Sequence, residues 1–302
     1  MPWLPFASPP AVTVDRVSGR RGELVLQRRG AAFEIVYNGV LLMASYNGAS
    51  EAAMARIAYR RWEGAGGGRS RPGGGRNPAA ALGCSPAASG PNPPVSGAAA
   101  VRHCGPGEGR GVRVLVGGLG MGYTLAAALD LPGVERVDVV ELEPAVLAWN
   151  RGPLRGLNGG RLDDPRVRLW LADLSETPRL PREVRGCDLL LVDVDNGPER
   201  TVLASNRRLY RPRGLLALAR LLARGGVLAF WCPGLSPALA LRLWRTLGHV
   251  VRVPVPDPAL PPGVGWEGRR PLPPSQVYLS RPAGPSCEAR PVRLLGQEFR
   301  NR

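Results

Sequence analysis

The sequence contains no lysine, so all 40 of its basic residues are arginines. Together with 40 glycines and 32 prolines, this is typical of a GC-rich coding bias. A formal net charge of +16 would suggest nucleic acid or an anionic membrane as a partner. The arginines are scattered along the chain, and no nucleic-acid-binding motif accompanies them. We therefore expect a solvated basic surface and no nucleic-acid partner.

Metal-ligating side chains are also few. The chain has two histidines, and none of its five cysteines forms a CxxC pair; His103 beside Cys104 is the only such neighbour. Cys187 and Cys232 lie in apolar segments, where a free cysteine behaves as a small hydrophobic residue. We expect no metal site.

Long apolar runs are missing as well. The most apolar stretch, residues 214–231, is interrupted by Arg220, Arg224 and the pair Gly225–Gly226. The first 14 residues lack both the basic start and the continuous apolar core of a signal peptide. The sequence therefore predicts a cytoplasmic protein without membrane association.

Four segments differ in composition. Residues 1–62 predict a small β-rich unit, in which the stretch from about Glu23 to Arg61 holds two or three short strands, with a hairpin at Asn38–Gly39, and then a helix that Ser50 caps. Residues 63–110 are dominated by Gly, Pro, Ser and Ala and predict a disordered insertion. Residues 111–282 predict the main domain, and the tail at 283–302 carries no clear signal.

Strands and helices alternate from Val112 onward, as in an α/β domain. Near-continuous apolar runs, such as residues 187–192, predict buried parallel strands. Pro212 predicts the start of a helix that runs through Arg224 and ends at Gly225–Gly226. A further helix is expected from Ser236 to Gly248, and residues 249–255 and 276–281 predict a terminal hairpin.

A glycine-rich turn follows the first strand of this domain. Gly118, Gly120 and Gly122 form GxGxG, in which the backbone can turn tightly and approach a ligand, although a close-packed turn would also explain it. The next strand ends in Glu141, whose carboxylate can accept hydrogen bonds from ribose hydroxyls. The third glycine comes one place earlier than in the GxGxxG of nicotinamide dehydrogenases. The spacing favours the class I fold that binds S-adenosylmethionine.

Two further strands also end in acids. Asp173 ends the third strand, and Asp193 and Asp195 follow the apolar run of the fourth in the stretch LLLVDVDNGPER. Asp, Asn, Gly and Pro are turn residues, so a simple turn is one interpretation. The other is a ligand site, because open α/β sheets bind ligands at the carboxyl ends of their strands. A spacing of two allows both acids to face the same side.

These motifs resemble those of the spermidine synthase (polyamine aminopropyltransferase) family. IVYNGVLLM resembles the family's LVLDG hairpin, VGGLGMG its GGGDGG loop, and VVELEPAVL its EID strand. DDPRVRLWLADL resembles the segment that ends in DG, and LLVDVDNGP resembles the DSSDP loop. The resemblance covers the N-terminal unit and the whole nucleotide-binding domain, and leaves out the insertion and the tail.

The resemblance implies a Rossmann-like class I S-adenosylmethionine-dependent methyltransferase fold with a small N-terminal β-rich unit. It implies decarboxylated S-adenosylmethionine or S-adenosylmethionine as co-substrate, a small-molecule amine as acceptor and no metal, and it leaves a homodimer open. Gly118, Gly120 and Gly122 would approach the nucleoside. Glu141 would bind ribose, Asp173 adenine, and Asp193 would be the catalytic base, while Asp195 would attract the amine.

Departures from the family pattern keep two alternatives open. Gly120 replaces the acid of the GGGDGG loop, and Asn196 replaces the second acid of the DSSDP loop. The first helix has Glu51 but lacks the Tyr and His of the family's polyamine channel; Tyr46 could pack on the sulfonium. The alternatives are a methyltransferase that uses S-adenosylmethionine and a non-catalytic nucleoside-binding protein.

Overall fold

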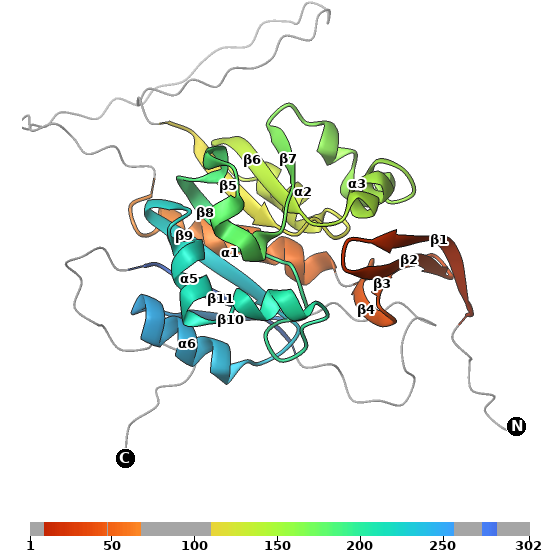
Figure 1. Ribbon diagram of the computed structural model, residues 1–302. Helices are drawn as coiled ribbons and strands as arrows, with labels where there is room; N and C mark the ends of the chain where they lie inside the picture. Colours follow the sequence, from red (N-terminus) through yellow and green to blue (C-terminus); the bar gives the residue numbers. More distant parts are fainter. Residues whose placement is uncertain (1–8, 47, 68–109, 257–273, 283–302) are drawn as a thin grey trace, which may run out of the picture. The chain divides into compact units, whose positions relative to one another are not determined.

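The computed structural model describes residues 9–46, 48–67, 110–256 and 274–282 (Figure 1). Most of the insertion predicted at 63–110 and the tail predicted at 283–302 lie outside these residues, so both stay predictions. Residues 1–67 and 111–302 belong to one compact unit. Within this unit, the N-terminal strands contact the main domain.

The N-terminal unit is a four-stranded antiparallel sheet in the order β1-β2-β3-β4. Its strands are β1 (Ala11–Gly19), β2 (Gly22–Arg29), β3 (Ala32–Tyr37) and β4 (Val40–Ala44). The expected turn at Asn38–Gly39 joins β3 to β4, and both of its residues have positive φ. The two or three strands expected between Glu23 and Arg61 are β2, β3 and β4, and β1 is a further strand that the sequence did not predict. β1 has no buried residue and pairs with β2 along its length, so its burial pattern has no alternation of buried and exposed positions.

The main domain contains a seven-stranded sheet in the order β10-β11-β9-β8-β5-β6-β7. β11 runs antiparallel to both of its neighbours, and the other strands are parallel to one another. The predicted fold class and the predicted terminal hairpin of β10 and β11 are confirmed. The strands are β5 (Val112–Gly117), β6 (Val134–Glu141), β7 (Val167–Leu171), β8 (Cys187–Val192), β9 (Leu222–Cys232), β10 (Val251–Val255) and β11 (Ser275–Ser280).

Helices pack on both faces of this sheet and form two hydrophobic cores. One core joins the sheet to α1, α2, α3 and the N-terminal strands, and the other joins it to α5 and α6. The α-helices are α1 (Gly48–Glu63), α2 (Tyr123–Leu129), α3 (Pro144–Arg151), α4 (Arg155–Asn158), α5 (Pro212–Ala219) and α6 (Pro237–Leu247). Short 3-10 turns are η1 (Arg161–Asp163), η2 (Leu174–Arg179), η3 (Arg182–Val184) and η4 (Ala204–Arg208).

Two predicted helix ends need correction. α1 begins at Gly48, so Ser50 lies within the helix. α5 ends at Ala219, and β9 begins at Leu222, so the pair Gly225–Gly226 lies inside a strand. The pairing of β8 with β9 shifts register across this stretch, and Gly225 has a φ of 82°. The glycines permit a bulge in a strand and do not end a helix.

Candidate active site

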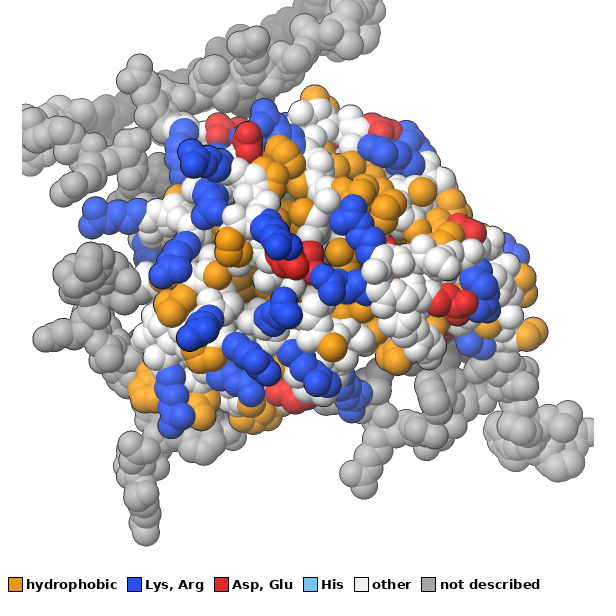
Figure 2. Space-filling view, viewed as in Figure 1, with side chains coloured by type: hydrophobic (Ala, Val, Ile, Leu, Met, Phe, Trp, Pro, Cys, Tyr) orange, Lys and Arg blue, Asp and Glu red, His pale blue; other side chains and the backbone are white. Residues whose placement is uncertain are grey.

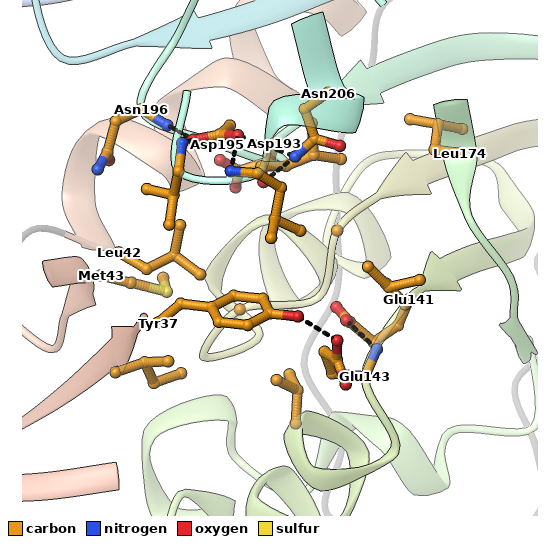
Figure 3. Close-up of a pocket in the computed structure, with 18 of the residues that line it drawn as sticks. Tyr37, Leu42, Met43, Glu141, Glu143, Leu174, Asp193, Asp195, Asn196 and Asn206 are labelled. Carbon is orange, nitrogen blue, oxygen red and sulfur yellow. Dashed lines mark hydrogen bonds between the residues drawn. The ribbon is translucent and has the colours of Figure 1, made fainter. Parts of the chain in front are cut away.

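A cavity lies at the carboxyl ends of β5, β6 and β8 and is closed by side chains of the N-terminal sheet (Figure 3). Because parallel strands end at one edge of the sheet, the residues after them meet there. The structure brings Gly118, Gly120, Glu141, Asp173, Asp193 and Asp195 together around this cavity. From the N-terminal side, Leu24, Ile35, Tyr37, Leu42 and Met43 complete the wall.

The glycine loop has the backbone that its sequence predicts. Gly118, Gly120 and Gly122 have φ values of 89°, 52° and 85°, which L side chains rarely adopt. A Cβ on Gly118 would lie 2.1 Å from the carbonyl oxygen of Asp193, so the loop and the end of β8 touch through backbone. A Cβ on Gly120 would lie 2.6 Å from the sulfur of Met43. Met43 therefore occupies the space that a side chain at position 120 would need.

Glu141 organises the loop as well as facing the cavity. Its Oε2 accepts a hydrogen bond from the Leu119 amide (2.8 Å), and its Oε1 accepts one from the Glu143 amide (2.8 Å). Burial raises the pKa of this carboxyl, and the backbone donors partly oppose that rise. The Leu142 amide is among these backbone donors. A carboxylate has about four lone-pair sites, so Glu141 keeps acceptor capacity for a ligand.

Glu143 is a cavity residue that sequence reasoning missed. It is 2% exposed, accepts a hydrogen bond from the Tyr37 hydroxyl, and accepts the Arg20 amide at 2.9 Å and 3.1 Å (Figure 3). Burial and this carboxylate raise the pKa of Tyr37. Glu143 thus ties β3 and the β1–β2 turn to the main domain. In the sequence, the only indication of this role is that Glu143 lies two residues after Glu141.

Asp173 lies where this cavity meets a second one. Its Oδ1 accepts the Ser175 amide (2.8 Å), and its Oδ2 forms an ion pair with Arg21 (2.7 Å) from the β1–β2 turn. The two cavities share Leu142, Ala172 and Asp173. The second cavity is completed by Arg20, Arg21, Glu176, Arg179 and Leu180. The two cavities therefore adjoin each other past the ends of β6 and β7.

In the described part of the chain, the Asp193 carboxylate has one hydrogen-bond partner, while its backbone amide donates to the Gly117 carbonyl. Its Oδ2 accepts a bond from the Thr124 hydroxyl (2.7 Å), a buried residue in the first turn of α2. Burial raises the pKa of Asp193 to about 6, and the Thr124 bond opposes the rise. A carboxyl with this pKa is ionised above pH 6 and can still take up a proton near neutral pH.

Asp195 also lines the cavity but is bound differently. It accepts hydrogen bonds from the Asn196, Val202 and Leu203 amides and from the Asn206 side chain, at 2.6–3.3 Å. It is 5% exposed, and burial raises its pKa against these donors. Four donors match the four lone-pair sites of a carboxylate. The loop after β8 is therefore built around Asp195.

The cavity wall is acidic in a basic protein. Its acidic lining residues are Glu51, Glu141, Glu143, Asp173, Asp193 and Asp195, and no arginine of the described chain lines it. On the face drawn in Figure 2, by contrast, arginine side chains are spread over many elements. An acidic cavity attracts cationic ligands such as amines and sulfonium ions.

Three other expectations from the sequence concern Tyr46, a metal site and a membrane-spanning helix. Tyr46 does not line the cavity; it lies near Glu34 of β3, which together with burial raises its pKa. Within the described ranges, no group of His, Cys, Asp and Glu side chains could hold a metal ion. No helix in the same ranges is long and apolar enough to cross a membrane.

Comparison with known proteins shows partial sequence similarity and a shared fold. No family model matches the chain. Over 144 residues it is 37% identical to a polyamine aminopropyltransferase of Mycobacterium tuberculosis, a match that covers 45% of this chain and 25% of that protein. Over 115 residues it is 38% identical to polyamine aminopropyltransferase 1 of Streptomyces coelicolor, covering 37% and 20%. The chain is thus similar in sequence to polyamine aminopropyltransferases over part of its length.

Solved structures of spermidine synthases share the fold. One, in complex with the transition-state analogue AdoDATO, has a TM-score of 0.60 and 12% identity, over 90% of this chain and 74% of that one. The spermidine synthase from Thermotoga maritima has a TM-score of 0.58 and 13% identity, over 90% and 73%. The chain matches about a quarter of the length of its curated relatives.

Proposed function

We propose that the chain transfers an aminopropyl group from decarboxylated S-adenosylmethionine to an amine, a reaction of polyamine biosynthesis. The names of its relatives support the reaction class. The acids along one cavity support the substrate chemistry, because both substrates are cations. The observation that carries the proposal is Asp193, a cavity carboxyl whose pKa is raised to about 6.

The nucleoside of the co-substrate would lie along the two adjoining cavities. The Glu141 carboxylate keeps acceptor capacity for a ribose hydroxyl beyond its bonds to backbone amides. The adenine would reach Asp173 and the second cavity, where Leu142, Ala172 and Leu180 offer apolar contacts. Arg21 covers this end from the β1–β2 turn through its ion pair with Asp173.

The reaction needs a free amine in line with the carbon next to the sulfonium. An amine enters as an ammonium ion, Asp193 accepts its proton, and the nitrogen lone pair forms the new C–N bond. The C–S bond breaks as the C–N bond forms, and its electron pair stays on sulfur, so methylthioadenosine leaves as a neutral thioether. Positioning can contribute about 7–11 kcal/mol to such a step. A well-placed base contributes about 10²–10⁴-fold.

Calorimetry with methylthioadenosine tests the nucleoside site. Glu141→Gln should weaken binding by about tenfold or more, because it removes a charge-assisted acceptor and disturbs the Leu119 and Glu143 amides. Glu135→Gln is the matched control, since Glu135 is an exposed acid at the start of the same strand. Absence of binding by the parent protein, or equal effects of the two variants, would contradict the site.

Methyl transfer from S-adenosylmethionine is the second candidate, and Gly120 favours it. The family's acid at this position is absent, and Met43 fills the space beside Gly120 and accepts the Met121 amide through its sulfur (3.1 Å). By the resemblance, that acid helps to exclude the carboxylated co-substrate. A competition assay between the two nucleosides decides: a clear preference for the decarboxylated form excludes methyl transfer. Nucleoside binding without turnover of any amine would favour a non-catalytic protein.

A further inference from the structure

The Thr124 side chain contacts the proposed base, Asp193, from the helix α2. It lies in the first turn of α2, directly after the glycine loop, and is 2% exposed. It is not among the residues that line the cavity. Its hydroxyl reaches two acceptors: Oδ2 of Asp193 at 2.7 Å and the backbone carbonyl of Glu51 at 3.4 Å.

We propose that Thr124 is a positioning residue that holds Asp193 before and after the proton transfer and sets the pH at which Asp193 becomes a competent base. The proposal rests on the proposed function, in which Asp193 accepts the proton of the amine. A hydroxyl has one proton and two lone pairs, so it can donate to only one of its two neighbours at a time.

Each protonation state of Asp193 then fixes the direction of the bonds. An ionised Asp193 has no proton, so Thr124 must donate to it, consistent with the short distance. A protonated Asp193 can donate to Oγ1 of Thr124, and the hydroxyl proton can turn to the carbonyl of Glu51. The Thr124–Asp193 bond therefore survives proton transfer with its direction reversed, and the carboxyl keeps its orientation.

No cation takes over this task in the described part of the cavity. The other ionisable groups that line it are all acids: Tyr37, Glu51, Glu141, Glu143, Asp173 and Asp195. Tyr210, a buried phenol, is also close enough for the charges of Asp193 and Asp195 to raise its pKa. The Thr124 hydroxyl is thus the donor that favours the ionised form of Asp193, against the effect of burial.

The test is the pH dependence of kcat in two variants of the full chain. Thr124→Val keeps the shape and removes the hydroxyl, so the acid limb of the profile should move to higher pH by about one to two units. Thr124→Ser keeps the hydroxyl and should restore the limb. Thr246→Val in α6 is the control for a Thr-to-Val change away from the cavity. Methylthioadenosine binding should be unchanged in all three.

Thermal unfolding without ligand gives a readout that does not depend on turnover. The parent loses stability as pH rises through the pKa of Asp193. In Thr124→Val this loss should continue to higher pH, and in Thr124→Ser it should end at the same pH as in the parent. If Thr124→Val does not fold, Thr124→Ala serves in its place. An acid limb and an unfolding profile that match the parent in Thr124→Val or Thr124→Ala would overturn the proposal, as would a Ser variant that behaves like Val.

A failure of the proposed function looks different. If Asp193→Asn keeps the parent's rate and profile, Asp193 is not the base, and both proposals fall. If Asp193→Asn loses activity while Thr124→Val keeps the parent's profile, only the role of Thr124 falls.

Discussion

The two edges of the seven-stranded sheet use their carboxylates differently. At the amino-terminal edge, acids pair with arginines: Asp164 with Arg166 at 2.8 Å, and Asp130 with Arg161 at 2.7 Å. At the carboxyl-terminal edge, Glu141, Asp193 and Asp195 are held by amides and a hydroxyl. Arg166 lowers the pKa of Asp164, while burial raises the pKa of all three cavity acids.

The difference shows how a basic chain keeps an acidic site. An arginine next to a carboxylate stabilises its charge and removes its attraction for other cations. Neutral donors fix the direction of a carboxylate and leave its negative charge available to a ligand. With 40 basic residues in the chain, the site depends on keeping arginines away from the cavity. Arginines do line the adjoining second cavity of the described chain, namely Arg20, Arg21 and Arg179, and Arg21 pairs there with Asp173.

The largest expected effect is on turnover at the carboxyl-terminal edge. Asp193→Asn keeps the shape and the contact with Thr124 but removes the proton acceptor, so kcat should fall about 10²–10⁴-fold. Methylthioadenosine binding should change little. Steady-state rates and calorimetry measure both, with Asp130→Asn as the control at the opposite edge. A rate loss below about threefold would contradict the assignment of Asp193.

A second effect separates Asp195 from Asp193. Asp195→Asn turns an amide NH₂ toward donors that now bind a carboxylate, so a buried N–H group loses its acceptor. This should lower the free energy of unfolding by about 1–3 kcal/mol. Denaturant unfolding measures it, and Asp130→Asn, on an exposed side chain, should stay within about 0.5 kcal/mol of the parent. Equal stability losses in Asp195→Asn and Asp130→Asn would show that the four hydrogen-bond donors do not depend on the charge of Asp195.

A third effect has the opposite sign and depends on pH. The folded-state pKa of Asp193 lies at about 6, above its ordinary value of 3.8, so the folded protein binds more protons between these values. Stability is therefore lost as pH rises from about 4 to about 6, and the loss persists above that range. Asp193→Asn removes this loss and should be about 1–2 kcal/mol more stable than the parent at pH 7.5, with the partial exposure of Asp193 taken into account.

Thermal unfolding of both proteins without ligand, from pH 4 to pH 8, measures this difference. It should shrink toward pH 4, where the parent's Asp193 is protonated. A difference that stays constant over the whole range would show that its cause is not the charge of Asp193.

The smallest effect lies at the amino-terminal edge. The pKa of Asp164 is lowered by Arg166, so the pair contributes stability at neutral pH that is lost as pH falls below about 4. Asp164→Asn should cost at most about 1 kcal/mol at pH 7, because Arg166 is partly exposed. Added salt should reduce that cost. A larger effect than that of Asp195→Asn would overturn the contrast between the two edges.

The sequence alone determined the frame of the molecule. Apolar runs and turn residues placed the parallel strands, the glycine loop and the terminal hairpin, and strand ends carried the acids. These features follow from local patterns, since burial on both faces makes a strand apolar and GxGxG permits positive φ. The pattern failed where pairing partners decide: β1 has no buried face, and Gly225–Gly226 form a bulge against β8.

Only the tertiary structure decided what each acid does. Asp193 and Asp195 are two residues apart and looked alike in the sequence. One faces a single hydroxyl from α2, and the other accepts four donors from its own loop and from η4. The N-terminal sheet packs over the strand ends, and this packing brings Tyr37 and Arg21 to the site, where they contact Glu143 and Asp173. Hydrogen-bond partners far apart in the chain set the charge and direction of a carboxylate, and no local pattern records them.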